Sequence, residues 1–250
     1  MTFIRKNQFV RFVALLAIVM TPILAQTFSS GSTGADGALS LTTPGTYVFD
    51  PKTFTPPLNP SGDGIFNFTT ITIGSGVTVK VTGAVFNTPV VWLASGAVKI
   101  DGTVDLSGQN AFSANNTTLR TYSTPGAGGY PGGYPSVGGN PAGPGLGPLG
   151  GPVGLDCNSW STGGGVSANQ FAVPLVGGSG GGALGSNSGG AGGGAILIAS
   201  SASVTGSGTI RARGGEWTSG TGAGGGGTIR IVAPTVTLSG PLNAGGGGQG

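Results

Sequence analysis

Alternating apolar and polar residues predict strands in two parts of the chain. In these stretches an aliphatic residue recurs at every second position, and the residues between are mostly Thr, Lys, Arg or Asp. This period of two is typical of strands that bury one face and expose the other. The stretches are 70–73, 77–81, 98–106, 195–198, 208–212, 228–232 and 235–238. After residue 25 no segment carries an apolar stripe with a period of 3.6, so we expect very little helix.

An internal repeat indicates how these strands are arranged. Residues 102–108, 208–214 and 240–246 share a pattern in which small or aliphatic residues occupy the second and fourth positions after a glycine. Short strands with glycine corners in a unit of about 20 residues are typical of a β-solenoid, whose stacked coils share one core. The fold class is therefore all-β, a parallel β-helix or β-solenoid. The predicted inward residues are Val77, Val79, Val81, Val98, Ile100, Val104, Leu106, Ile196, Ile198, Ile210, Ile229, Ile231, Val236, Leu238 and Leu242.

Glycine is unevenly distributed and suggests the division of the chain. Of the 55 glycines, 12 lie in residues 1–125 and 43 in residues 126–250. Strand alternation is lost where glycine and proline become dense, which favours a long, partly disordered insertion between coils. The predicted organisation is a signal peptide at 1–25, an N-terminal cap segment at 26–63, first coils at 64–108, the insertion at 109–194 and further coils at 195–250. Because the last repeat ends in glycines without a polar cap, we expect the solenoid to be truncated at residue 250.

The N-terminus has the features of an export signal. Arg5, Lys6 and Arg11 precede an apolar run at 12–20, and cleavage is predicted after Ala25. The alternative is an N-terminal anchor that is never cleaved. Removal of the signal leaves seven basic and seven acidic residues, so the formal charge of +3 belongs to the signal and predicts no affinity for nucleic acid.

The composition excludes several kinds of chemistry. With no His and a single cysteine, Cys157, the chain cannot form a His-dependent metal site, a Ser-His-Asp or Cys-His nucleophile, or an internal disulfide. We expect no cofactor. The weak catalytic candidates are Asp101, Asp105 and Lys99, which lie on the outward face of a predicted strand, where paired carboxylates can act as general acid and base. A solvated exterior of mixed charge is the alternative, because the repeat aligns Asp105 with Arg211.

Aromatic and hydroxyl side chains offer two further surfaces. Tyr130, Tyr134 and Trp160 lie in the predicted insertion, where exposed rings can stack on sugars. The alternative is that they pin the insertion onto a core. Rows of outward Thr resemble the water-ordering face of an ice-binding solenoid, but their spacing is too irregular for that interpretation, and Thr is favoured on any strand.

The chain resembles a largely uncharacterised group of glycine-rich secreted proteins of soil bacteria that are predicted to form right-handed parallel β-helices. The resemblance rests on 32–49, on 90–108, and on 192–199 together with 210–215. It implies the same fold and supplies no catalytic residues.

The predicted function is an exported, non-catalytic structural or adhesive surface protein, a rigid β-solenoid with a neutral Gly/Ser/Thr-rich surface. The alternatives are a polysaccharide lyase or hydrolase of the β-helix type, and a glycan-binding or ice-binding solenoid. Expected partners are extracellular glycans or components of the cell envelope, without nucleic acid and without a transmembrane span in the mature chain. The expected location is the extracellular space or cell surface, with the periplasm as an alternative.

Overall fold

The computed structural model describes residues 27–59, 61–114, 120–154, 162–165 and 172–248. These residues contain thirteen strands and one 3-10 turn, η1 (Pro51–Thr53). The strands are β1 (Gly37–Leu41), β2 (Gly45–Val48), β3 (Ile65–Ile73), β4 (Val77–Lys80), β5 (Val90–Ala94), β6 (Val98–Ile100), β7 (Thr103–Asp105), β8 (Ala195–Ser200), β9 (Ser203–Gly206), β10 (Thr209–Arg211), β11 (Thr228–Val232), β12 (Thr235–Leu238) and β13 (Leu242–Asn243). Among the described residues the structure contains no helix with the length and hydropathy of a membrane span.

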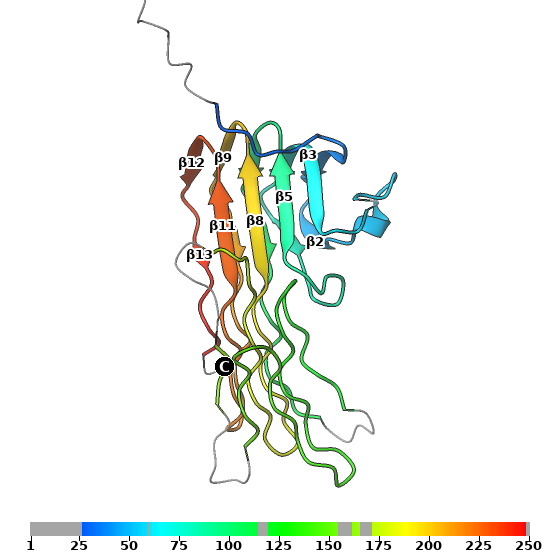
Figure 1. The fold of residues 1–250 in the computed structure, drawn as a ribbon, viewed down its shortest axis with the longest axis vertical. Helices are drawn as coiled ribbons and strands as arrows, with labels where there is room; N and C mark the ends of the chain where they lie inside the picture. The colour runs from blue at the N-terminus through cyan, green and yellow to red at the C-terminus, as the bar shows by residue number, and fades with distance from the viewer. Residues whose placement is uncertain (1–26, 60, 115–119, 155–161, 166–171, 249–250) are drawn as a thin grey trace, which may run out of the picture.

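The strands wind as successive coils of a parallel solenoid (Figure 1). Strands β5, β6 and β7 form one coil, β8, β9 and β10 the next, and β11, β12 and β13 the last described. Every pairing between named strands is parallel. One sheet has the order β11-β8-β5-β3-β6-β9-β12, with β1 on β3, and the other has the order β13-β10-β7-β4-β2. The nine-residue strand β3 pairs with β5 in its first half and with β6 in its second. One long strand in this coil therefore lies beside two successive shorter strands of the next coil. The predicted all-β parallel solenoid is confirmed.

Equivalent positions of neighbouring coils stack their side chains in the core. Val79 of β4 pairs with Val104 of β7, which pairs with Ile210 of β10, and all three side chains are fully buried. The ten predicted inward residues from Val77 to Ile210 are all buried. Parallel stacking in register therefore produces one continuous aliphatic column per face.

The inward residues of the last described coil are not buried as predicted. Val236 and Leu242 occupy the expected register, but they are 47% and 52% exposed. Ile229, Ile231 and Leu238 are only partly buried. The reason is position, because β11, β12 and β13 form the edge of the described stack and have a neighbouring coil on one side only.

Corner glycines serve two purposes. Gly76, between β3 and β4, adopts a φ of +76°, which glycine tolerates without cost. A positive φ is not found at Gly102, Gly208 or Gly240. They stack on one another at one corner of successive coils, and a Cβ atom at Gly208 or Gly240 would collide with the backbone carbonyl of the preceding glycine of the column. These three are needed for close approach of the coils, a reason that differs from the positive φ of Gly76.

An aromatic cluster fills the N-terminal end of the core. The ring of Phe49 lies 4.9 Å from Phe66, 5.1 Å from Trp92 and 5.9 Å from both Phe54 and Phe86, measured between ring centroids. Phe49, Phe66 and Trp92 are buried to within 1%. The segment after β2, which includes η1 and Leu58, contributes to this packing.

Glycine-rich segments extend the coils beyond the ends of the strands, below them in Figure 1. Residues 177–183 illustrate their order, because the direction of their hydrogen bonds repeats every third residue. The N–H groups of Gly178 and Gly181 donate to carbonyls of one neighbouring segment, both at 2.8 Å. The N–H groups one position further along the chain donate to a second neighbouring segment, and those two positions further along donate to a third. These neighbours are 190–193, 162–165 and 143–146.

The carbonyl groups of 177–183 accept from three further segments in the same rotation. These segments are 130–133, 222–225 and 151–154. A chain with three residues per turn and hydrogen bonds only to its neighbours has the geometry of a polyproline II helix. Residues 177–183 thus form the centre of a bundle with six surrounding segments, and we call this region the glycine bundle.

The absence of side chains is what permits this packing. A Cβ atom added to Gly180 would lie closer than 3.0 Å to the carbonyl oxygen of Pro131, a distance that real Cβ atoms essentially never show. The same holds at Gly192 against the carbonyl of Gly178. The predicted insertion at 109–194 supplies most of these segments, and 212–215 and 222–227 supply others. Within the described residues, hydrogen-bonded backbone takes the place of an apolar core.

Candidate functional site

Lys99 and Asp101 form an ion pair at the corner between β6 and β7. The Lys99 Nζ lies 3.0 Å from the Asp101 carboxylate. The backbone N–H of Ser207, one coil further, donates to the same carboxylate at 3.1 Å. The hydrogen bond from Lys99, followed by that from the Ser207 N–H, holds the pKa of Asp101 below its ordinary value of 3.8. A general acid needs a raised pKa, so this environment favours a structural corner over acid catalysis.

Asp105 lies apart from that pair, on β7 in the other sheet. It stands between Lys80 of β4 and Arg211 of β10, with all three in register. The alignment of Asp105 with Arg211 expected from the repeat is therefore confirmed. The Asp105 carboxylate accepts the backbone N–H of Ser107 at 3.0 Å, which orients it along the strand edge. Of the three catalytic candidates, the structure brings Lys99 and Asp101 together and places Asp105 in a separate row of charges.

Two hollows flank Asp105 on the outer surface. One, of about 430 Å³, lies toward Lys80, and the other, of about 400 Å³, lies toward Arg211. Both are lined by Asp105, Ser107 and Gly108, so they adjoin each other on either side of Asp105, and we call the two together the β7 groove. It crosses the strands β4, β7, β10 and β13.

The second hollow has a preorganised polar wall. The Glu216 carboxylate lies 3.6 Å from Arg213 and accepts the Asn110 amide at 3.0 Å, while the Asn110 carbonyl accepts the Glu216 N–H at 3.0 Å. Sequence reasoning did not select Lys80, Arg213 or Glu216. In the sequence these residues are marked only by outward positions in the repeats or by their place just after a repeat.

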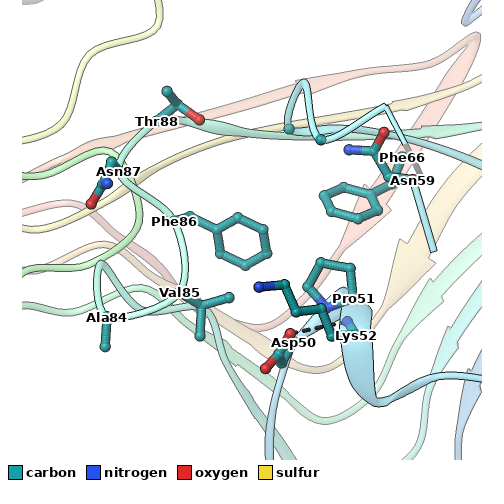
Figure 2. Close-up of a pocket in the computed structure, with 12 residues that line it drawn as sticks. Asp50, Pro51, Lys52, Asn59, Phe66, Ala84, Val85, Phe86, Asn87 and Thr88 are labelled. Carbon is teal, nitrogen blue, oxygen red and sulfur yellow. Dashed lines mark hydrogen bonds between the residues drawn. The ribbon is translucent and has the colours of Figure 1, made fainter. Parts of the chain in front are cut away.

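A separate pocket of about 450 Å³ lies at the N-terminal end of the core. Figure 2 shows the rings of Phe66 and Phe86 near the side chains of Asp50, Pro51 and Lys52. The Asp50 carboxylate accepts the Lys52 backbone N–H at 3.0 Å. Phe66 is fully buried and Phe86 is 9% exposed, so this pocket presents little aromatic face for stacking on a sugar.

The tyrosines of the predicted glycan-stacking set pack against the glycine bundle. The Tyr134 ring lies over Gly143, and the Arg120 guanidinium lies 4.9 Å from the ring centroid. Tyr122 packs edge-on against Tyr134 at 5.2 Å. Tyr130 lies over Gly147. Both predicted tyrosines are half-buried, whereas Trp160 and Cys157 lie outside the described residues.

Comparison of the chain with protein-family models, with curated proteins and with solved structures finds no match to any of them. In the part of the chain that the structure describes, no group of three or more His, Cys, Asp or Glu side chains is placed to hold a metal ion. The site must therefore be interpreted from its own geometry.

Proposed function

We propose that this chain is an exported, non-catalytic structural or adhesive surface protein, of the glycine-rich β-helix type that the sequence resembles. The observation that carries the proposal is the continuity of backbone hydrogen bonding from strands into the glycine bundle. Residues 188–194 run directly into β8, 222–227 run into β11, and β10 runs into 212–217. Two differently built halves thus form one rigid scaffold.

The surface chemistry supports this role. Thr is the commonest residue at the outward positions of the strands, and the glycine bundle presents backbone, Pro and Gly between its few aromatic residues. The chain after residue 25 is formally neutral. A neutral, rigid, weakly charged surface is suited to contact with glycans or cell-envelope components, because it imposes no long-range repulsion on them. Export by the N-terminal signal to the cell surface or extracellular space belongs to the same proposal.

The test is an adhesion assay on the full chain expressed with its own N-terminus. Exported protein is separated into cell-surface, matrix and soluble fractions, and the purified chain is added to cells and to immobilised matrix glycans. We expect processing after Ala25 and retention on the surface. Recovery only as a soluble monomer that binds neither cells nor glycans would contradict the adhesive role. Release of reducing sugar or unsaturated products from a glycan panel would contradict the non-catalytic role.

A further inference from the structure

We propose that the β7 groove binds an uncharged, hydroxyl-rich polysaccharide strand that lies along the solenoid axis. This inference rests on the proposed adhesive function and names the class of partner for one surface. Of the hollows described above, the β7 groove combines polar side chains, residues from several coils and a lining held by hydrogen bonds, whereas the pocket of Figure 2 is lined in part by the buried rings of Phe66 and Phe86.

The lining of the groove selects a polar ligand. Apart from two glycines, the walls of the hollow toward Arg211 consist wholly of charged or polar residues. Such a surface offers nothing to an apolar ligand. The hydroxyl groups of a sugar both donate and accept, so they can bond the carboxylate of Asp105 as well as the guanidinium of Arg211.

The charge pattern disfavours an anionic ligand. Three cations, Lys80, Arg211 and Arg213, are interspersed with the carboxylates of Asp105 and Glu216, and Arg213 is already paired with Glu216. A polyanion lying along the groove would meet Asp105 at its centre. Charges of alternating sign create no extended field of one sign, and they serve as hydrogen-bonding groups for a neutral polyol.

The spacing of the row suits a polymer. Lys80, Asp105 and Arg211 stand on adjacent strands, which are about 4.8 Å apart in a sheet. A polysaccharide that runs along the axis therefore meets a new polar side-chain group on every coil. Among the described residues, neither Lys80 nor Arg211 forms an ion pair with another side chain, so both heads are available. Asp105 is already oriented by the Ser107 N–H, which lowers the entropic cost of binding.

The experiment uses the full chain and measures binding to cellulose, chitin and dextran as neutral probes and to alginate as an acidic probe. The groove variant is Lys80→Ala combined with Arg211→Ala, two exposed residues that form no ion pair with another described residue. Arg230→Ala removes one exposed cation of β11 outside the groove, and Lys52→Ala alters the pocket of Figure 2. Circular dichroism of each variant verifies that it is folded.

We expect the wild-type chain to bind at least one neutral polysaccharide, with an affinity that changes little between about 0.1 M and about 1 M salt. The groove variant should lose about tenfold or more in affinity, because it loses two charge-assisted hydrogen bonds. Arg230→Ala and Lys52→Ala should bind as the wild type does. Binding to alginate alone, a loss caused by Lys52→Ala in place of the groove variant, or no binding to any neutral probe would overturn the proposal.

The adhesion assay separates this inference from the proposed function. If the wild-type chain adheres to cells and the groove variant binds polysaccharide as well as the wild type does, the groove is wrong and the adhesive function stands. If the chain binds a neutral polysaccharide through the groove but adheres to no surface, the groove stands and the adhesive function is wrong.

Discussion

Replacement of Gly180 by Ala is the sharpest perturbation of the glycine bundle. Gly180 lies in the central segment 177–183, is buried, and does not occupy the left-handed region of φ. Backbone strain therefore does not enter, and the effect of the methyl group is steric. The new Cβ would collide with the carbonyl oxygen of Pro131, a backbone atom that cannot rotate away. Residues 130–133 must move outward to accommodate it.

The magnitude follows from what that movement disrupts. Overpacking costs about 1–3 kcal/mol. The displaced segment donates two hydrogen bonds to the centre, from Tyr130 to Gly178 at 3.0 Å and from Gly133 to Gly181 at 2.8 Å. Their loss costs about 0.5–1.5 kcal/mol each. Alanine also restricts the unfolded chain, which returns about 0.4–1 kcal/mol. We expect Gly180→Ala to lower the free energy of unfolding by about 1–6 kcal/mol.

The assay is equilibrium unfolding in guanidinium chloride, with Gly246→Ala as the matched control. A Cβ at Gly246 would meet its nearest neighbour, the Gly224 carbonyl oxygen, at an ordinary 3.5 Å. The control should change the free energy of unfolding by less than about 1 kcal/mol. Equal stabilities for the two variants would refute the close-packed bundle.

Two further predictions concern the core and the corner ion pair. Ile210→Ala should cost about 2–5 kcal/mol of unfolding free energy, since the side chain is fully buried, whereas Leu242→Ala in the same column, 52% exposed, should cost less than about 1 kcal/mol; equal costs in urea unfolding would show that the last described coil is buried. The depressed pKa of Asp101 means that its ion pair contributes stability above the ordinary value of 3.8, and this contribution is lost as pH falls through the lower folded-state pKa. Asp101→Asn should therefore flatten the fall of melting temperature below about pH 4, and a wild-type pH profile in the variant would be the contrary result.

The strands were predictable because side-chain type marks their period. In β4, β6, β7 and β10 the inward residue is Val or Ile and the outward residue is polar. The sequence alone therefore predicts which face of each strand is buried. The exposure of Val236 and Leu242 was not predictable from that pattern. Burial depends on a neighbouring coil, and the alternation within a strand carries no information about its neighbours.

The glycine bundle was not predictable by the same reasoning. Its period of three lies in the direction of backbone N–H and C=O groups, and a run such as 177–182 has almost no side chains to mark that direction. Low complexity therefore indicated disorder by composition alone. The retrospective signal is the recurrence of uninterrupted small-residue runs at 177–183, 188–195 and 222–227, which are six to eight residues long.

The candidate site was only partly visible in the sequence. The alignment of repeats paired Asp105 with Arg211, because both occupy the third position after a corner glycine. Glu216 and Asn110 are also 106 positions apart, the same offset that aligns Asp105 with Arg211, so the repeat carried the signal for this pair just beyond the last residues that were aligned. The grouping of Asp101 with Asp105 depended on their proximity in sequence, whereas in the structure Asp101 lies in the corner before Gly102 and Asp105 lies on β7.

Amide hydrogen exchange tests the central claim most directly, namely that the glycine-rich half is a rigid hydrogen-bonded scaffold continuous with the solenoid. The account predicts that the N–H groups of Gly178, Gly181, Gly190 and Gly193 exchange as slowly as those of β8, while Gly139 and Gly185, exposed in turns, exchange rapidly. Exchange of the first four at the rate of an unstructured chain, with β8 still protected, would contradict it.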